Sequence, residues 1–220
     1  HPTAGQPWPG DQQRRAGAHL DAHRPVSTGD FAELAERVLA AEPRLGGTRL
    51  VCIDGPAGSG KTTFAGRLAG ALGADAVVLH MDDLYEGWTF SGAVPRLTAG
   101  VLDPLAERRP GAFHRYDWLE GAFSPEVTPV PAAPVLVVEG CGSGARVLDS
   151  WMSLLIWVEA PPALRLARGL ARDGVELDGH WRRWQQDESA AFAAEDTRAR
   201  AGLRIDGTAP GDGTAFFLLP

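Results

Sequence analysis

The chain has 220 residues, 44% of them hydrophobic and 22% charged, which is an ordinary composition for one globular domain. Its net charge of −7 and its pI near 5.3 argue against a general affinity for nucleic acids or anionic membranes. No apolar run approaches the roughly eighteen residues that a membrane-spanning helix needs, and no signal-peptide pattern opens the chain. We therefore expect a cytoplasmic monomer or homodimer whose ligands are small molecules.

Proline and glycine divide the chain into segments. Residues 1–26 are rich in both and show little periodicity, so we expect a mostly disordered leader before a single domain of residues 27–220. A helix is expected at about residues 30–41, capped by Ser27 or Thr28. Further along, residues 86–98 lack periodicity, residues 103–108 indicate a short helix, and residues 110–118 indicate an irregular or hairpin stretch before the proline-rich run at 125–134.

Five segments are expected to form strands, and four of them contain an unbroken apolar run. The five segments are residues 50–53, 76–80, 135–138, 154–158 and 202–206. Helical patterns alternate with these segments, and two helices, expected at 161–172 and 177–197, separate the last two. The alternation predicts a three-layer α/β sandwich with a five-stranded, mostly parallel sheet. The helices at about 161–200 would form a lid.

Residues 55–62 read G-P-A-G-S-G-K-T directly after the first apolar run, which is the G-x-x-x-x-G-K-T pattern of a phosphate-binding loop. Its glycines let backbone N–H groups turn inward around a polyphosphate at the positive end of the following helix. Lys61, the only lysine in the chain, would reach the β- and γ-phosphates, and the Thr62 hydroxyl would ligate Mg²⁺. The residues expected to hold the nucleotide here are Gly55, Ala57, Gly58, Ser59, Gly60, Lys61, Thr62 and Thr63.

Acidic residues end two other predicted strands. Asp82 and Asp83 follow the strand at 76–80, whose last residue, His80, we interpret as a packing residue, and Glu139 ends the strand at 135–138. The carboxyl ends of parallel strands meet at one edge of the sheet, so these acids should face the loop. A small-molecule kinase needs a catalytic base and a magnesium-side carboxylate there. We assign the base to Asp82 and the metal to Glu139, Thr62 and Asp82, with Asp83 as an open alternative.

Three arginines follow the fourth predicted strand at helical spacing. Arg165, Arg168 and Arg172 stand at i, i+3 and i+7 and therefore share one face of a helix. Such side chains can neutralise charge on a transferred phosphoryl group. We expect Arg165 to bind nucleotide and Arg168 and Arg172, with Lys61 and Asp82, to take part in catalysis.

Together these stretches resemble the uridine kinase-like group of P-loop kinases, which includes phosphoribulokinase and bacterial pantothenate kinase. The resemblance covers about residues 49–207. It rests on the loop, on D-D-L-Y at 82–85, Y-D-W at 116–118, V-E-G at 138–140, and R-L-A-R with the R-D that follows at 165–173. Residues 181–197 resemble actinobacterial members of unassigned substrate.

The resemblance implies ATP and Mg²⁺ as cofactors and a hydroxyl of a small metabolite as the acceptor of the γ-phosphoryl group. It places Tyr116 and Asp117 near the acceptor, and we add their neighbours Asp83, Tyr85 and Arg115 to that set. The two tyrosines, like Trp88 and Trp118, are equally compatible with core packing.

Three departures from the family pattern leave other functions open. Gly121 stands where the uridine kinase pattern has histidine, Gly169 replaces a paired lid arginine, and the E-R-G-R run after the lid is missing. One alternative is therefore a nucleotide-binding regulatory or assembly protein with weak hydrolysis. Another is a nucleoside monophosphate kinase, in which Arg96 and Arg115 would bind the acceptor phosphate.

Overall fold

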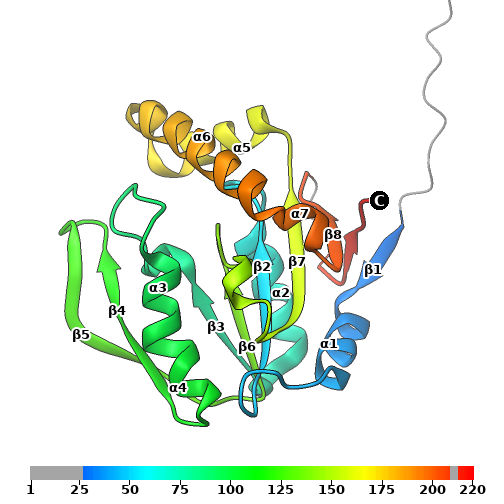
Figure 1. Ribbon diagram of the computed structural model, residues 1–220. Helices are drawn as coiled ribbons and strands as arrows, with labels where there is room; N and C mark the ends of the chain where they lie inside the picture. Colours follow the sequence, from blue (N-terminus) through cyan, green and yellow to red (C-terminus); the bar gives the residue numbers. More distant parts are fainter. Residues whose placement is uncertain (1–26, 209–212) are drawn as a thin grey trace, which may run out of the picture.

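A five-stranded parallel sheet forms the centre of the protein (Figure 1). The computed structural model describes residues 27–208 and 213–220, so the leader expected at residues 1–26 lies outside the described residues. The strands follow the order β3 (Ala76–His80), β6 (Val135–Glu139), β2 (Arg49–Asp54), β7 (Met152–Glu159) and β8 (Leu203–Asp206). All four neighbouring pairs are parallel, which confirms the predicted α/β fold and sheet.

Each face of the sheet packs into its own apolar cluster, because successive residues of a strand point to opposite sides of the sheet. Val51 and Ile53 of β2 face one side, with Phe31 of α1 (Phe31–Ala40) and Phe64 of α2 (Lys61–Leu72). Cys52 of the same strand belongs to the cluster on the other side. The sheet is thus the middle layer of the predicted sandwich.

The helix on the second face is longer than the sequence predicts. It comprises α3 (Ala93–Leu97), the π-helical turn η3 (Thr98–Leu102) and α4 (Asp103–Ala106), so the expectation of a helix only at 103–108 is wrong. Pro95 is tolerated because it lies in the first turn, where no N–H partner is lost. Gly100 lies against Ala112, where an added Cβ would come within 2.6 Å of the backbone oxygen.

A hairpin covers the edge of the molecule beside α3 (Figure 1). It pairs β4 (Gly111–Asp117) with β5 (Ala122–Val130), and the pairing shifts register between His114 and Tyr116. Of the two alternatives open for residues 110–118, the hairpin is the one observed. Its second strand contains Pro125 and Pro129 of the proline-rich run, where no strand was predicted. Both strands of a two-stranded sheet are edge strands, in which the missing N–H of proline is tolerated.

The remaining elements are short or lie near the chain ends. Asp30, not Ser27 or Thr28, caps α1, because its carboxylate accepts from the N–H groups of Ala32 and Glu33. Thr28 instead belongs to β1 (Thr28–Asp30), which pairs with β9 (Ala215–Phe217). The short helical turns are η1 (Gly73–Asp75), η2 (Met81–Asp83), η4 (Arg146–Leu148) and η5 (Val175–Leu177).

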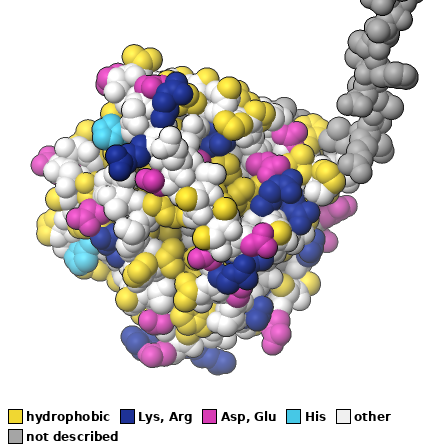
Figure 2. All heavy atoms as spheres, turned by 45° about the horizontal axis from the view of Figure 1, so that its top comes forward, with side chains coloured by type: hydrophobic (Ala, Val, Ile, Leu, Met, Phe, Trp, Pro, Cys, Tyr) yellow, Lys and Arg dark blue, Asp and Glu magenta, His cyan; other side chains and the backbone are white. Residues whose placement is uncertain are grey.

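The lid consists of α5 (Pro162–Asp173), α6 (Asp178–Glu195) and α7 (Thr197–Arg200), close to the predicted bounds. It extends over the carboxyl ends of the strands (Figure 1). On the lid side of the molecule, positive and negative side chains are interspersed (Figure 2). Among residues 27–208 and 213–220, no helix combines the length and the apolar character needed to cross a membrane.

Candidate functional site

The loop between β2 and α2 has the backbone that a phosphate loop requires. Gly55, Gly58 and Gly60 have φ values of 138°, 79° and 102°, which favour glycine. Close packing adds a second constraint, because a Cβ on Gly55 would lie 2.0 Å from the Val158 oxygen and one on Gly58 2.6 Å from the Arg165 oxygen. Strand, loop and helix follow one another in the predicted order.

Lys61 begins α2 and is held inside the site, with only 7% of its surface exposed. Its Nζ donates to the Pro56 oxygen at 3.0 Å. Burial by itself disfavours the ammonium form, but acidic neighbours that include Glu139 and Glu188 outweigh it and raise the pKa of Lys61. The lysine therefore carries a fixed positive charge beside the loop.

A carboxylate and a hydroxyl meet where a divalent cation would be expected. Thr62 Oγ1 donates to Glu139 Oε1 at 3.1 Å, and His80 Nδ1 lies 2.6 Å from the same oxygen. The hydrogen bond to Glu139 raises the pKa of His80, against the opposing effect of partial burial. His80 is therefore part of the site's hydrogen-bond network, which corrects its interpretation as a packing residue.

The chemistry of these donors fits Mg²⁺, which prefers oxygen ligands and keeps several waters. Thr62 and Glu139 would supply the hydroxyl and the carboxylate, while phosphate oxygens and water complete the shell. Within the described parts of the chain, no three His, Cys, Asp or Glu side chains form a metal cluster.

The two adjacent aspartates differ in their surroundings. Both lie in η2, directly after β3. Asp83 accepts from Arg115 Nε at 2.7 Å, so its carboxylate is paired with the hairpin. Asp82 is solvent-accessible, yet local desolvation and the nearby charge of Glu139 raise its pKa. Trp118 Nε1 donates to the Asp82 backbone oxygen at 3.1 Å, which fixes the turn against the hairpin.

The residues expected around the acceptor differ in exposure and in hydrogen-bond partners. Tyr85 is 1% exposed and its hydroxyl donates to the Cys141 oxygen, so it is a core residue and not the acceptor contact that the sequence suggested. Asp117 accepts from the N–H groups of Leu119 and Glu120 and thereby caps the hairpin turn. Tyr116 is 8% exposed and packs edge-on against Trp118. The exposed groups on this side include Asp82, Arg115, Asp117 and the indole of Trp118, which is 44% exposed.

The three lid arginines share a helix but contact different partners. Arg165 is buried and donates to the Ala57 oxygen at 3.2 Å and to Glu188 at 2.8 Å, so it braces the loop from the lid and offers little surface to a nucleotide. Arg168 donates to the oxygens of Gly58 and Gly207 at 3.2 and 2.9 Å.

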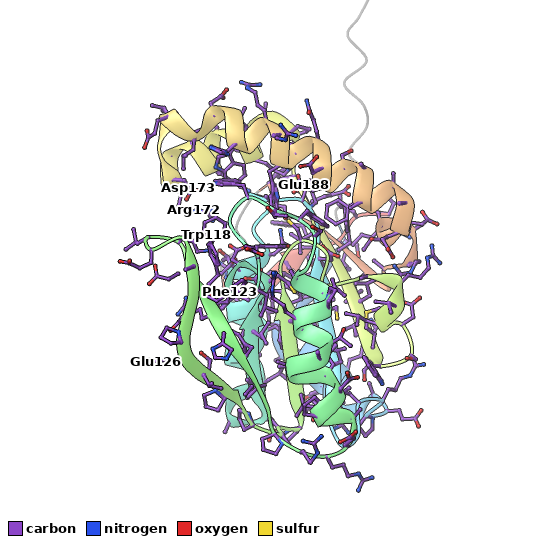
Figure 3. The ribbon with its side chains drawn as sticks, turned by 60° about the vertical axis from the view of Figure 1, so that its left-hand side comes forward. Trp118, Phe123, Glu126, Arg172, Asp173 and Glu188 are labelled. Carbon is purple, nitrogen blue, oxygen red and sulfur yellow. The ribbon has the colours of Figure 1, made fainter. Side chains whose placement is uncertain are left out.

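Arg172 points from the lid toward the hairpin end that carries Trp118 (Figure 3). It pairs with Asp173 at 2.7 Å, and its guanidinium carbon lies 5.7 Å from the centre of the Trp181 ring. Its charge acts to lower the pKa of Asp82. Of the three arginines, Arg172 is therefore the one placed electrostatically with the candidate base.

Two buried acids, Asp54 and Glu188, contact the loop although no role was predicted for either from the sequence. Asp54, the last residue of β2, is fully buried and accepts from the N–H groups of Gly55, Gly142 and Gly144 at 2.7 to 2.9 Å. Burial raises the pKa of Asp54 to about 6, although these hydrogen bonds oppose the shift. An acid ending an apolar strand just before the loop was the available signal. Glu188 of α6 carried no comparable signal.

A cavity of about 270 Å³ adjoins the loop at the start of α2. Aromatic side chains from both ends of the described chain form its apolar wall, and arginine and aspartate side chains form its polar part. The lining includes Gly60, Thr63, Arg67, Arg168, Asp206, Phe216 and Phe217. Its size and its contact with the loop suit the base of a nucleotide.

Solved structures share this architecture. A possible uridine kinase from Bacillus stearothermophilus superposes with a TM-score of 0.60 at 20% identity, over 80% of this chain and 97% of that one. A candidate fructose transport system kinase from a Silicibacter species gives a TM-score of 0.58 at 25% identity, over 80% and 98% of the two chains. No protein-family model matches the chain. This protein therefore has the uridine kinase-like P-loop kinase fold.

Proposed function

We propose that this protein is an ATP- and Mg²⁺-dependent phosphotransferase that moves the γ-phosphoryl group to a hydroxyl of a small molecule. One observation carries the proposal. Lys61, Glu139 and Asp82 come from three segments and interact electrostatically at one edge of the sheet: Glu139 acts to raise the pKa of both Lys61 and Asp82, and Lys61 acts to lower that of Asp82. A site that only binds nucleotide does not need an accessible carboxylate beside the metal-type oxygens.

The nucleotide would lie along the loop, with its base in the 270 Å³ cavity and its phosphates toward Lys61. Thr62 and Glu139 would hold Mg²⁺, which would neutralise negative charge on the phosphates when bound. Arg168 lines the same cavity, and Arg172 lies on the side of Asp82. This arrangement supports transfer of the γ-phosphoryl group from ATP to an acceptor that lies between the loop and Asp82.

In the proposed reaction, Asp82 accepts the proton of the acceptor hydroxyl. The hydroxyl oxygen forms a bond to the γ-phosphorus, and the bond to the β,γ-bridging oxygen breaks and leaves ADP. The raised pKa of Asp82 suits this role, because a base whose pKa is closer to the working pH transfers protons more effectively. Lys61 and Arg172 would stabilise the negative charge of the transferred group.

The pairing of the nearby arginines favours an acceptor without a phosphate. Arg96 binds Glu86 at 2.9 Å and Arg115 binds Asp83 at 2.7 Å, so both guanidinium groups that a monophosphate would need are already engaged. The two similar structures carry names that refer to uridine and fructose. Nucleosides, ketohexoses and simple alcohols are therefore the first acceptors to test.

The deciding experiment compares Asp82→Asn with the wild type in an acceptor screen that follows ADP release. Asp82→Asn should lower turnover by about a hundredfold or more while ATP affinity changes little, because the amide cannot accept the proton. Asp75→Asn, an exposed change of the same chemistry in η1, should behave as the wild type. Full activity of Asp82→Asn refutes the assignment of the base. ATP binding with no acceptor-stimulated turnover would instead support a regulatory nucleotide-binding protein.

A further inference from the structure

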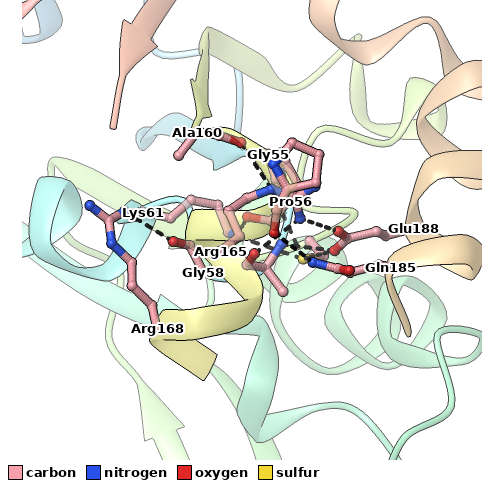
Figure 4. A network of polar contacts seen from close by, with 12 residues as sticks. Gly55, Pro56, Gly58, Lys61, Ala160, Arg165, Arg168, Gln185 and Glu188 are labelled. Atoms are coloured by element: carbon pink, nitrogen blue, oxygen red, sulfur yellow. Dashed lines mark hydrogen bonds and ion pairs between the residues drawn. The ribbon is translucent and has the colours of Figure 1, made fainter. Parts of the chain in front are cut away.

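A buried ion pair from the lid holds both polar groups of one residue in the phosphate loop (Figure 4). The Ala57 N–H donates to Glu188 Oε2 at 2.8 Å, and the Ala57 oxygen accepts from Arg165 Nη1 at 3.2 Å. The same Arg165 nitrogen donates to Glu188 Oε1 at 2.8 Å. Arg165 lies on α5 and Glu188 on α6, so both lid helices contribute to this contact.

The contact is built into the interior. Glu188 is 1% exposed and Arg165 is 8% exposed. Gly58, the next loop residue, packs so closely on the Arg165 backbone that an added Cβ would lie 2.6 Å from its oxygen. Cys141 Sγ, which is 3.6 Å from Lys61 Nζ, lies 3.4 Å from Glu188 Oε2. Burying two charges is costly unless their hydrogen bonds are satisfied, and here Ala57 satisfies both.

Glu188 approaches the loop from the side away from the base cavity. It lines a second cavity of about 360 Å³ with Pro56, Arg165 and Gln185. That cavity shares no lining residue with the 270 Å³ cavity at Gly60 and Thr63. The carboxylate is therefore placed behind the loop, where it does not compete with a nucleotide that enters from the other side.

We propose that Glu188 is a positioning residue that, together with Arg165, fixes the Ala57 peptide and so presets the phosphate loop for a polyphosphate. A loop that is already ordered loses less conformational freedom when a ligand binds. The proposal deepens the proposed function and rests on it only in assuming that the loop binds phosphate. According to this proposal, the lid helices also stabilise the loop in the protein without bound ligand.

The first test uses the free protein and needs no ligand. In Glu188→Gln one acceptor oxygen becomes an NH₂ donor, which must face either the Arg165 guanidinium or the Ala57 N–H, so the ion pair and one of the two hydrogen bonds are lost while the side-chain volume is kept. We expect the amide hydrogens of Gly55 and of residues 57–60 to exchange about tenfold faster than in the wild type, with no change in β6. Asp187→Asn, an exposed neighbour on the same helix, removes one charge without touching the loop and should change nothing. Equal loop exchange in both variants overturns the proposal.

The second test measures the affinity of magnesium tripolyphosphate and of ATP. Both should bind about tenfold more weakly to Glu188→Gln, because the loop contacts the phosphates and not the base. Tighter binding would overturn the proposal, since it would mean that the carboxylate occupies the phosphate position. If Glu188→Gln folds poorly, the double variant Arg165→Met with Glu188→Met removes both charges and should show the same two effects. The two proposals can fail separately. Faster loop hydrogen exchange in Glu188→Gln, together with an acceptor screen that finds no acceptor, would support the positioning role and refute only the kinase activity.

Discussion

The Thr62 hydroxyl donates to Glu139 Oε1 across 3.1 Å and thereby joins the first turn of α2 to the carboxyl end of β6. These residues are 77 positions apart in the sequence. Their contact depends on the parallel pairing of β2 with β6, which sets Ile53 opposite Glu139. The candidate magnesium site is thus a consequence of strand order.

Removing either the Thr62 hydroxyl or the Glu139 carboxylate should weaken the binding of Mg²⁺. Thr62→Val and Glu139→Gln are each expected to raise the Mg²⁺ concentration for half-maximal ATP turnover by about 10- to 100-fold. The double variant should cost less than the product of the two effects, because both oxygens serve one ion. Thr128→Val in the hairpin is the matched control. Independent, multiplicative effects would argue against a shared metal.

Replacing the single lysine tests the phosphate contact. Lys61→Met should lower kcat/KM for ATP by at least about a hundredfold, because one preorganised cationic donor is lost. Lys61→Arg should not restore activity, since a planar guanidinium differs in shape from the compact ammonium held at the Pro56 oxygen. Steady-state kinetics with thermal melting separates loss of function from loss of fold. An arginine variant with wild-type kcat/KM would contradict this reading.

The packing around Gly169 explains why this position does not hold the paired lid arginine of the uridine kinase pattern. A Cβ at this position would lie 2.4 Å from the Trp181 ring, so the indole occupies the space of a longer side chain. Gly169→Arg should therefore destabilise the protein by about 1–3 kcal/mol and change the tryptophan emission. Ala171→Arg, on the exposed side of the same helix, adds the same charge and should change the free energy of unfolding by less than about 0.5 kcal/mol. Urea unfolding measures both. Equal stability of the two variants would refute the packing explanation.

The stability of the protein should carry a pH-dependent contribution from Asp54. Its pKa is about 6 in the folded protein and near 3.8 when unfolded, so the folded state binds the proton more tightly. The stabilising contribution is therefore complete below about pH 4 and is lost as the pH rises through about 6.

The non-titrating variant Asp54→Asn isolates this effect. Between pH 5 and pH 7, the free energy of unfolding of the wild type relative to Asp54→Asn should fall by about 1 kcal/mol. Urea titrations at the two pH values supply the comparison. A difference that stays constant or grows with pH would show that the hydrogen bonds from Gly55, Gly142 and Gly144 keep Asp54 ionised instead.

Local patterns were sufficient for the parts of the chain whose information is contiguous. Four of the five strands were predictable because each contains an unbroken apolar run, whereas the fifth contains Arg204. The loop was predictable because its glycines, Lys61 and Thr62 have fixed spacing. The helix over residues 93–106 was not predictable, since Pro95 and Gly100 indicate a break that packing against the sheet and the hairpin overrides. The strand that contains Pro125 and Pro129 was obscured for a similar reason.

The sequence by itself determined that the chain is a three-layer α/β protein with a phosphate loop, because apolar runs and glycine spacing act over a few residues. Only the tertiary structure decided which polar and charged groups are buried and which partners they contact. It paired Asp83 with Arg115, buried Tyr85, gave Asp54 three glycine donors, and brought Glu188 to Ala57 across 131 positions. Charges act through space, so their partners depend on strand order and lid packing, which no local pattern records.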